Sequence, residues 1–276
     1  MSNALQGKVA LITGSGRGIG RAVALKFASQ GARVVINDLD AEVADSVVQE
    51  IIALGGEAVS CNGSVTAEGF AERFIKTAVD CFGGLDIIVN NAGYTWDNVI
   101  QKMSDEQWHD IIDCHLTAPF KILRAAQPVI RESVKSESAR GERVLRRVIN
   151  ISSLAGVFGN AGQINYSAGK AGIIGMTQAL AKEWGRLNTT VNCVAFGLIQ
   201  TRLTVKASDN QTMNIDGREI KVGISDEIAA ASKHIIPLGR FGTTEEAAGA
   251  VYLFAIPEAD YVSGQTLVCA GGITGV

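Results

Sequence analysis

The stretch KVALITGSGRGIG, residues 8–20, decides the fold that this sequence predicts. Lys8–Thr13 is a short apolar run typical of a buried strand, and residues 18–30 have the apolar spacing of a helix that ends at Gly31. Glycines between a strand and a helix let the main chain turn tightly and let a phosphate approach the positive N-terminus of the helix. We therefore expect a dinucleotide-binding turn, with cofactor contacts from Gly14, Arg17, Gly18, Ile19 and Gly20.

Strand-like and helix-like segments alternate along the rest of the chain. Further strands are expected at Arg33–Asn37, Glu57–Cys61, Asp86–Asn90, 148–153, Thr189–Val194 and Thr266–Cys269. Helices are expected after Asp40, over 67–82, and from Ser104, where Gln107 completes a capping box. Repeated strand–helix units with continuously apolar strands predict an α/β fold, in which helices cover both faces of a seven-stranded parallel sheet. We expect one domain over residues 1–276.

A charged stretch, residues 131–147, interrupts this alternation. It is rich in arginine and glutamate and predicts an exposed helix end and loop. Such a stretch is either solvated surface or a docking site for an acidic carrier protein, and the arginines concerned are Arg140, Arg143, Arg146 and Arg147.

Residues 202–238 form a long excursion after the sixth strand. Within it, residues 212–222 predict a hairpin about the turn Asp216-Gly217. A long insertion at the C-terminal end of a strand, where α/β sheets bind their ligands, predicts a lid over the substrate.

Composition excludes several classes of protein. The 276 residues, 47% of them hydrophobic, are enough to bury the core of a large α/β domain. The net charge of −3 gives no reason to expect nucleic acid or an anionic membrane as a partner. The five cysteines are scattered without a C-x-x-C pair, so neither a disulfide framework nor a metal site is expected. With no apolar run near the roughly 20 residues of a membrane span and no room for a signal peptide, we expect a cytoplasmic protein.

Tyr166, Lys170 and Ser153 form the candidate catalytic group. Tyr166 and Lys170 are four residues apart, so on a helix they share one face, and Ser153 ends an apolar strand. A free tyrosine titrates near 10, and an ammonium beside it is expected to lower the pKa of the phenol, which makes it an acid or base near neutrality. Taken alone, Y-x-x-x-K is also the pattern of an ordinary helix surface pair.

The ends of the second and fourth strands complete the candidate cofactor site. Asp38 lies eighteen residues after Gly20, at the tip of the second strand, where its carboxylate can accept both hydroxyls of the adenosine ribose. The fourth strand ends in small residues that leave room for the middle of the cofactor, namely Asn91, Ala92 and Gly93.

At this point the chain resembles the short-chain dehydrogenase/reductase family over essentially its full length. T-G-x-x-x-G-x-G, N-N-A-G, S-x12-Y-x-x-x-K and residues 192–201 occur in the order and spacing of that family. The resemblance implies a nicotinamide cofactor, a Rossmann-type doubly wound sheet in the order 3-2-1-4-5-6-7, and a homotetramer. It also implies roles for single residues: Tyr166 as acid/base, Lys170 on the nicotinamide ribose, Ser153 on the substrate oxygen, Ile199 and Thr201 on the carboxamide, and Leu39, Ser64 and Val65 around the adenosine.

The sequence departs from the family pattern at three positions. His115 stands where the family usually has an asparagine that supports a water relay to the catalytic lysine, and a ring nitrogen could hold the same water. Phe196 replaces a proline and puts an aromatic ring beside the nicotinamide, which narrows the pocket. Ser64 replaces an aspartate and is a weaker partner for the adenine.

The substrate class follows from a narrower resemblance. Residues 93–98, 103–108 and 237–241 resemble the 3-oxoacyl-[acyl-carrier-protein] reductase subgroup. This resemblance implies interconversion of a 3-oxoacyl and a 3-hydroxyacyl thioester, with substrate contacts from Ser153, Gln163, Trp96 and Phe196. A hydroxysteroid or another secondary alcohol is the alternative substrate. A nucleotide-binding sensor without turnover is the alternative function, although the intact Ser153, Tyr166 and Lys170 argue against it.

Two residues oppose each other in the choice of cofactor. Arg17 is the kind of residue that pairs with a 2′-phosphate, whereas the carboxylate of Asp38 favours free ribose hydroxyls and repels a phosphate. Two unit charges about 4 Å apart repel by about 4 kcal/mol at an effective dielectric of 20, and an exposed ion pair offsets only about 0–1 kcal/mol. We therefore predict a preference for NAD(H), with NADP(H) as the alternative.

Overall fold

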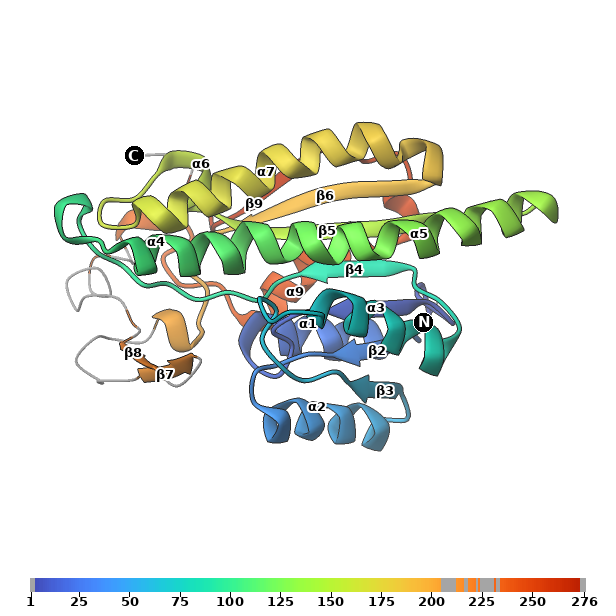
Figure 1. Ribbon diagram of the computed structural model, residues 1–276. Helices are drawn as coiled ribbons and strands as arrows, with labels where there is room; N and C mark the ends of the chain where they lie inside the picture. Colours follow the sequence, from blue (N-terminus) through green and yellow to red (C-terminus); the bar gives the residue numbers. More distant parts are fainter. Residues whose placement is uncertain are drawn as a thin grey trace.

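The chain forms one seven-stranded parallel sheet with helices on both sides (Figure 1). The structure is a computed structural model that describes residues 3–204, 212–215, 218–221, 223, 231 and 234–273. The strand order is β3-β2-β1-β4-β5-β6-β9, and β9 is the seventh strand of this sheet along the chain. The predicted α/β architecture and the order 3-2-1-4-5-6-7 are therefore confirmed.

The elements follow the predicted alternation. The strands of the sheet are β1 Val9–Ile12, β2 Arg33–Ile36, β3 Glu57–Ser60, β4 Ile87–Asn90, β5 Arg146–Ser153, β6 Thr189–Phe196 and β9 Thr266–Cys269. The main helices are α1 Gly18–Ala28, α2 Ala41–Ala53, α3 Phe70–Phe82, α4 Asp105–Ile112, α5 Ala118–Ala139, α6 Leu154–Phe158, α7 Ile164–Trp184 and α9 Thr244–Tyr252. No helix in the described ranges is long and apolar enough to cross a membrane.

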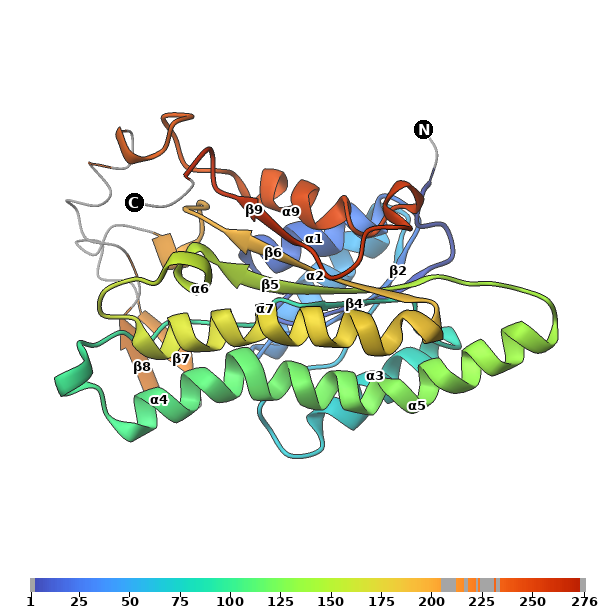
Figure 2. The ribbon, with the colours of Figure 1, turned by 90° about the horizontal axis from the view of Figure 1, so that it is seen from above.

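The sheet separates two layers of helices, and Figure 2 shows both layers from above. Successive side chains of a strand point to opposite faces. Ala10 and Ile12 of β1 accordingly pack in one core with residues of α1, α2 and α9, whereas Val9 and Leu11 pack in another with residues of α3 and α5. Inner strands such as β1 and β4 are buried along their whole length and form apolar runs, which is why the sequence predicts them well.

The long helix predicted from Ser104 is α4 and α5 joined by a π-helical turn, Asp113–Thr117. The capping box at its start is confirmed: the Ser104 hydroxyl accepts from the Gln107 amide at 3.1 Å, and the Gln107 side chain accepts from the Ser104 amide at 3.0 Å. A π-helical turn holds one extra residue per turn and often marks a functional site. Here the turn carries His115.

The prediction of an exposed loop over residues 131–147 is wrong for its last two arginines. Arg146 and Arg147 begin β5 and are only 5% and 6% exposed. Arg146 forms a bidentate pair with buried Glu137 of α5, at 2.5 and 3.1 Å, and Arg147 pairs with Asp260. Paired charges can be buried inside the fold, so these two arginines are unavailable to a carrier. Arg140 and Arg143 remain exposed, and carrier docking there stays a prediction.

The predicted hairpin in the excursion after β6 is confirmed. β7 Thr212–Ile215 pairs antiparallel with β8 Arg218–Lys221. The turn Asp216-Gly217 and much of the predicted lid at 202–238 lie outside the described residues. The lid therefore stays a prediction.

Candidate active site

A cavity of about 530 Å³ lies at the C-terminal ends of the sheet strands. Its wall contains almost every residue that the sequence predicts for the site: Gly14, Arg17, Gly18, Ile19, Gly20, Asp38, Leu39, Ser64, Val65, Asn91, Ala92, Gly93, His115, Ser153, Gln163, Tyr166, Lys170, Phe196, Ile199 and Thr201. Trp96, expected at the substrate, is the exception. Its ring packs 5.2 Å from the Arg218 guanidinium, and its carbonyl accepts from the Asn165 side chain at 3.1 Å.

The glycine turn at the start of α1 is shaped for a phosphate. Gly14 and Gly18 have φ of +61° and +54°, the left-handed region that glycine tolerates. A Cβ on Gly14 would lie 2.8 Å from the Ala92 Cα, and one on Gly20 would lie 2.1 Å from the Gly14 carbonyl oxygen. At Gly18 a Cβ would make only an ordinary van der Waals contact, 3.6 Å from the Thr201 Cγ2. The N-terminus of α1 has no side-chain cap, so its amides are available to the diphosphate of a nicotinamide cofactor.

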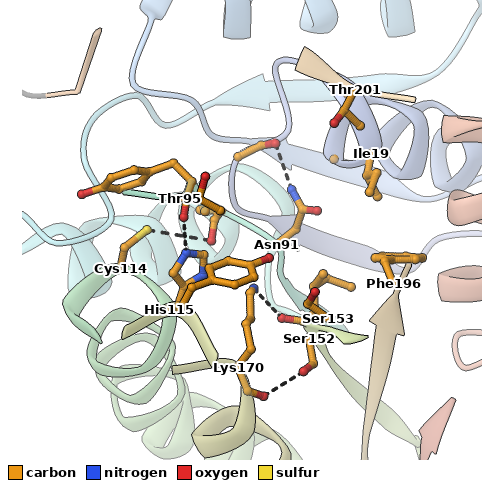
Figure 3. Close-up of a pocket in the computed structure, with 18 of the residues that line it drawn as sticks. Ile19, Asn91, Thr95, Cys114, His115, Ser152, Ser153, Lys170, Phe196 and Thr201 are labelled. Atoms are coloured by element: carbon orange, nitrogen blue, oxygen red, sulfur yellow. Dashed lines mark hydrogen bonds between the residues drawn. The ribbon is translucent and has the colours of Figure 1, made fainter. Parts of the chain in front are cut away.

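Two asparagines hold this turn in place. The side-chain amide of Asn91 donates to the backbone carbonyls of Thr13 and Gly14, at 3.0 Å each, and Figure 3 shows the Asn91 side chain pointing toward the turn. The Asn37 side chain accepts from the Gly14 amide at 3.2 Å and donates to the carbonyls of Cys61 and Gly63. Sequence reasoning missed Asn37, although a polar residue that ends an apolar strand is a usable signal.

Arg17 is held by acidic neighbours. Its guanidinium donates to Asp40 at 2.9 Å and lies 3.9 Å from the Asp38 carboxylate. The hydrogen bond from Arg17 is the main cause that lowers the pKa of the Asp40 carboxyl. Both Arg17 and Asp38 line the cavity, and the Asp38 side chain is largely buried.

The catalytic candidates meet where β5 ends beside α7. Ser153 closes β5, and its hydroxyl accepts from the Ala155 amide at 3.2 Å. The Lys170 ammonium on α7 donates to the Ile151 carbonyl at 2.8 Å and lies 5.6 Å from the Tyr166 ring centroid. The Lys170 carbonyl accepts from the Ser152 hydroxyl at 2.8 Å, which ties α7 to the strand end (Figure 3). The three side chains therefore share one wall of the cavity.

The pKa of Tyr166 is shifted in the direction opposite to the one expected from the sequence. Desolvation raises the pKa of the Tyr166 phenol to about 12, and the hydrogen bond with Ser153 only partly offsets it. Desolvation also lowers the pKa of Lys170 to about 8. The expectation of a lowered phenol pKa is thus wrong for the protein without its cofactor, because the loss of water outweighs the hydrogen bond with Ser153. Tyr166 is a protonated phenol at neutral pH.

His115 is buried beside Tyr166 and is only 3% exposed. Its ring meets the Tyr166 ring edge-on, with centroids 5.0 Å apart, and a Cβ on Gly93 would lie 2.2 Å from its Cε1. Nε2 lies 2.7 Å from the Tyr94 carbonyl oxygen, which can only accept, so Nε2 carries the hydrogen. Nδ1 is buried without a hydrogen-bond partner in the described part of the chain. Burial and then the charge of Lys170 hold the pKa of His115 well below 6.5, so the ring is neutral with an unused acceptor.

The hairpin supplies the wall opposite the sheet. Ile215 lines the cavity, and Ile215 and Ile220 are buried in a cluster with Tyr94, Ile111 and Cys114. The Arg218 guanidinium donates to Asp110 at 2.7 Å and pairs with Glu106. The sequence predicted the hairpin, but it could not indicate which residues the hairpin packs against. Among the described residues, no three His, Cys, Asp or Glu side chains gather as a metal site requires.

Comparison with known proteins gives consistent matches along the chain. A family model described as short chain dehydrogenase matches residues 8–212. The chain is 40% identical to a 3-oxoacyl-[acyl-carrier-protein] reductase of Synechocystis sp. over 272 residues, which are 98% of each protein. It is 39% identical to the 3-oxoacyl-[acyl-carrier-protein] reductase FabG of Vibrio cholerae, with 98% of each protein covered. The protein of that name from Escherichia coli is 37% identical, with 97% of this chain and 98% of that protein covered.

Proposed function

Because the chain belongs to the short-chain dehydrogenase/reductase family and is an oxidoreductase acting on a CH–OH group with NAD(P)(H), we propose that it reduces 3-oxoacyl thioesters to 3-hydroxyacyl thioesters. The observation that carries the proposal is the group of Ser153, Tyr166 and Lys170 on one cavity wall. The names of the full-length relatives support the thioester substrate.

Tyr166 is the proton donor in this proposal. With its pKa raised to about 12, the phenol holds its proton at neutral pH and can give it to the carbonyl oxygen of the substrate. A bound nicotinamide cofactor supplies the hydride for the carbonyl carbon. Ser153 donates a hydrogen bond to the same oxygen, and the Lys170 ammonium, fixed by the Ile151 carbonyl, stabilises the phenolate that remains.

His115 supports the return of a proton to Tyr166. The neutral ring keeps Nδ1 as a buried acceptor beside the Tyr166 ring, and a water that donates to Nδ1 can accept from the Lys170 ammonium. In this way His115 takes the place that an asparagine has in the family pattern. It acts through Lys170 and the water, so it is a positioning residue.

Gln163 and Phe196 border the substrate in this proposal. The Gln163 side chain donates to the Asp97 carboxylate at 2.6 Å, which fixes its amide at the cavity wall. Phe196 ends β6 and is buried, so its ring narrows the cavity near Ser153, its register partner on β5. A narrow, largely apolar site suits a linear acyl chain better than a steroid.

The preferred cofactor in this proposal is NAD(H). The Asp38 carboxylate is largely shielded from water, so a 2′-phosphate beside it would be strongly repelled. Arg17 is engaged with Asp40 and offsets little of this repulsion. Asp38→Ala should therefore relax or invert the preference, whereas Arg17→Ala should change it little. A higher kcat/KM with NADPH than with NADH in the unmodified protein would contradict this part of the proposal.

A substrate panel tests the reductase function. Purified protein is assayed with 3-oxoacyl thioesters on coenzyme A and on acyl carrier protein, with ketosteroids and with simple ketones, each with NADH and NADPH. We expect the highest kcat/KM for the 3-oxoacyl thioesters. Higher values for steroids would favour the alternative substrate class, and cofactor binding without turnover of any ketone would favour a sensor.

A further inference from the structure

One cation in the cavity wall has no part in the chemistry described above. Arg202 opens the 3-10 turn Arg202–Thr204, which follows β6, and it lines the same cavity as Arg17 and Asp38. No catalytic role suits it, because Lys170 already supplies the charge beside Tyr166.

The chain around Arg202 crosses the start of α1. The Thr201 Cγ2 lies 3.6 Å from the position that a Cβ on Gly18 would occupy. Hydrogen bonds fix this backbone: the Thr204 hydroxyl accepts from the Thr201 amide at 2.9 Å and donates to the Ile199 carbonyl at 2.5 Å. The Gln200 amide donates to the Gly242 carbonyl at 2.9 Å. The backbone of Arg202, whose side chain is exposed, is thus held next to the glycine turn.

The charges around Arg202 leave its guanidinium available. Within the described ranges, no carboxylate lies within ion-pair distance of it, whereas Arg17 is paired with Asp40 and lies near Asp38. Burial and then repulsion by Arg17 lower the pKa of Arg202, while Asp38 and Asp40 raise it. Arg17 and Arg202 both line the cavity. An anion between them and the helix would relieve this repulsion.

The N-terminus of α1 also lacks a side-chain cap for its backbone amides. The first turn of α1 contains no acidic residue, and Arg17 at the N-cap makes no side-chain cap. The first residues of this eleven-residue helix line the cavity, as does Arg202 from the segment after β6.

We propose that Arg202 binds the 5′-diphosphate of the nicotinamide cofactor together with the N-terminus of α1. The diphosphate is favoured over a 2′-phosphate because Asp38 occupies the ribose end of the site. This inference rests on the cofactor part of the proposed function and not on the substrate. Arg202 is supplied by the segment that leads into the predicted lid, so cofactor binding would also anchor the start of that segment.

Equilibrium binding tests the contact without turnover. Titrations of NADH, NADPH and ADP are compared for the unmodified protein, Arg202→Ala and Arg202→Lys. A hydrogen bond to a charged group contributes about 1.5–3 kcal/mol, so Arg202→Ala should weaken all three ligands by about 10- to 100-fold. Arg202→Lys should restore part of the loss, because it keeps the charge but not the planar fork. Arg240→Ala is the matched control, since Arg240 is exposed, pairs with Glu246 and lies outside the cavity wall.

The outcomes separate this inference from the reductase function. Unchanged affinities in Arg202→Ala, or a loss confined to NADPH, would overturn the assignment to the diphosphate. Failure of the unmodified protein to bind any of the three ligands would overturn it as well. Arg202-dependent binding in a protein that reduces no ketone would support this contact and contradict the reductase proposal.

Discussion

Two walls of the cavity are held in place differently. The sheet wall carries Ser153, Tyr166 and Lys170, and the hairpin wall carries Ile215. The sheet wall is fixed by buried hydrogen bonds between strand ends and α7, such as Lys170 to Ile151 and Ser152 to Lys170. The hairpin wall is fastened to α4 by Arg218, whose side chain is 36% exposed and pairs with Asp110 and Glu106. Among the described residues, Ile215 and Ile220 of the hairpin are buried in a small cluster with Tyr94, Ile111 and Cys114.

This difference predicts different consequences of mutation. Buried groups with complete hydrogen bonding hold the reacting atoms in one geometry, so the loss of one such group lowers kcat directly. Exposed ion pairs contribute about 0–1 kcal/mol, so the hairpin wall can move at little cost in stability. We infer that the sheet wall performs the chemistry, whereas control of access by the hairpin wall stays a prediction.

Removal of the Tyr166 hydroxyl should produce the largest effect. General acid catalysis typically contributes about 10²- to 10⁴-fold, so Tyr166→Phe should lose that much kcat while it keeps its affinity for NADH. Tyr252→Phe is the control, because the Tyr252 hydroxyl bonds Gln30 on the far side of α1. Near-normal turnover of Tyr166→Phe would remove Tyr166 from the mechanism.

The pH dependence should report Lys170. Its pKa is lowered to about 8 in the free protein, so the ammonium is present below that pH and is lost above it. Hence kcat/KM for ketone reduction should fall above about pH 8, by roughly tenfold per unit for a single group. No inflection from His115 should occur near 6.5, because its pKa lies well below that value. A profile flat up to pH 10 would contradict the role of Lys170.

Replacement of His115 should have a smaller effect. His115→Asn keeps a side-chain acceptor and should remain active, whereas His115→Leu should lose rate with its unfolding temperature nearly unchanged. His109→Leu, on the exposed face of α4, controls for loss of a histidine. Equal kcat in His115→Leu and the unmodified protein would assign His115 to packing alone.

Removal of the Arg218 side chain, which holds the hairpin against α4, should change the protein least. Arg218→Ala removes exposed pairs, so the free energy of unfolding should change by less than about 1 kcal/mol. The buried thiol of Cys114, which packs under Ile215, should nevertheless react faster with an alkylating reagent. Exposed Cys81 provides the internal reference in the same molecule. An unchanged ratio of Cys114 to Cys81 alkylation would show that Arg218 does not hold the wall.

The sheet and most of the site could be predicted because their signals are local. Continuous apolar runs mark strands covered on both faces, and the glycine turn and the Tyr166–Lys170 spacing are patterns within a few residues. The burial of Arg147 could not be predicted, since its partner Asp260 is 113 residues away. The raised pKa of Tyr166 depends on how the finished fold excludes water, and the π-helical turn at His115 depends on its fit against Gly93.

In the proposed reaction, the bound cofactor supplies hydride to the carbon of the substrate carbonyl, and Tyr166 supplies a proton to its oxygen. NADH carrying deuterium at the transferred position, incubated with a 3-oxobutanoyl thioester and the unmodified protein, tests it by mass spectrometry of the product. We expect one deuterium on C3 of a 3-hydroxybutanoyl thioester, and a rate of formation that falls by about 10²- to 10⁴-fold in Tyr166→Phe. Product without deuterium at C3, or equal rates of formation in the two proteins, would contradict it.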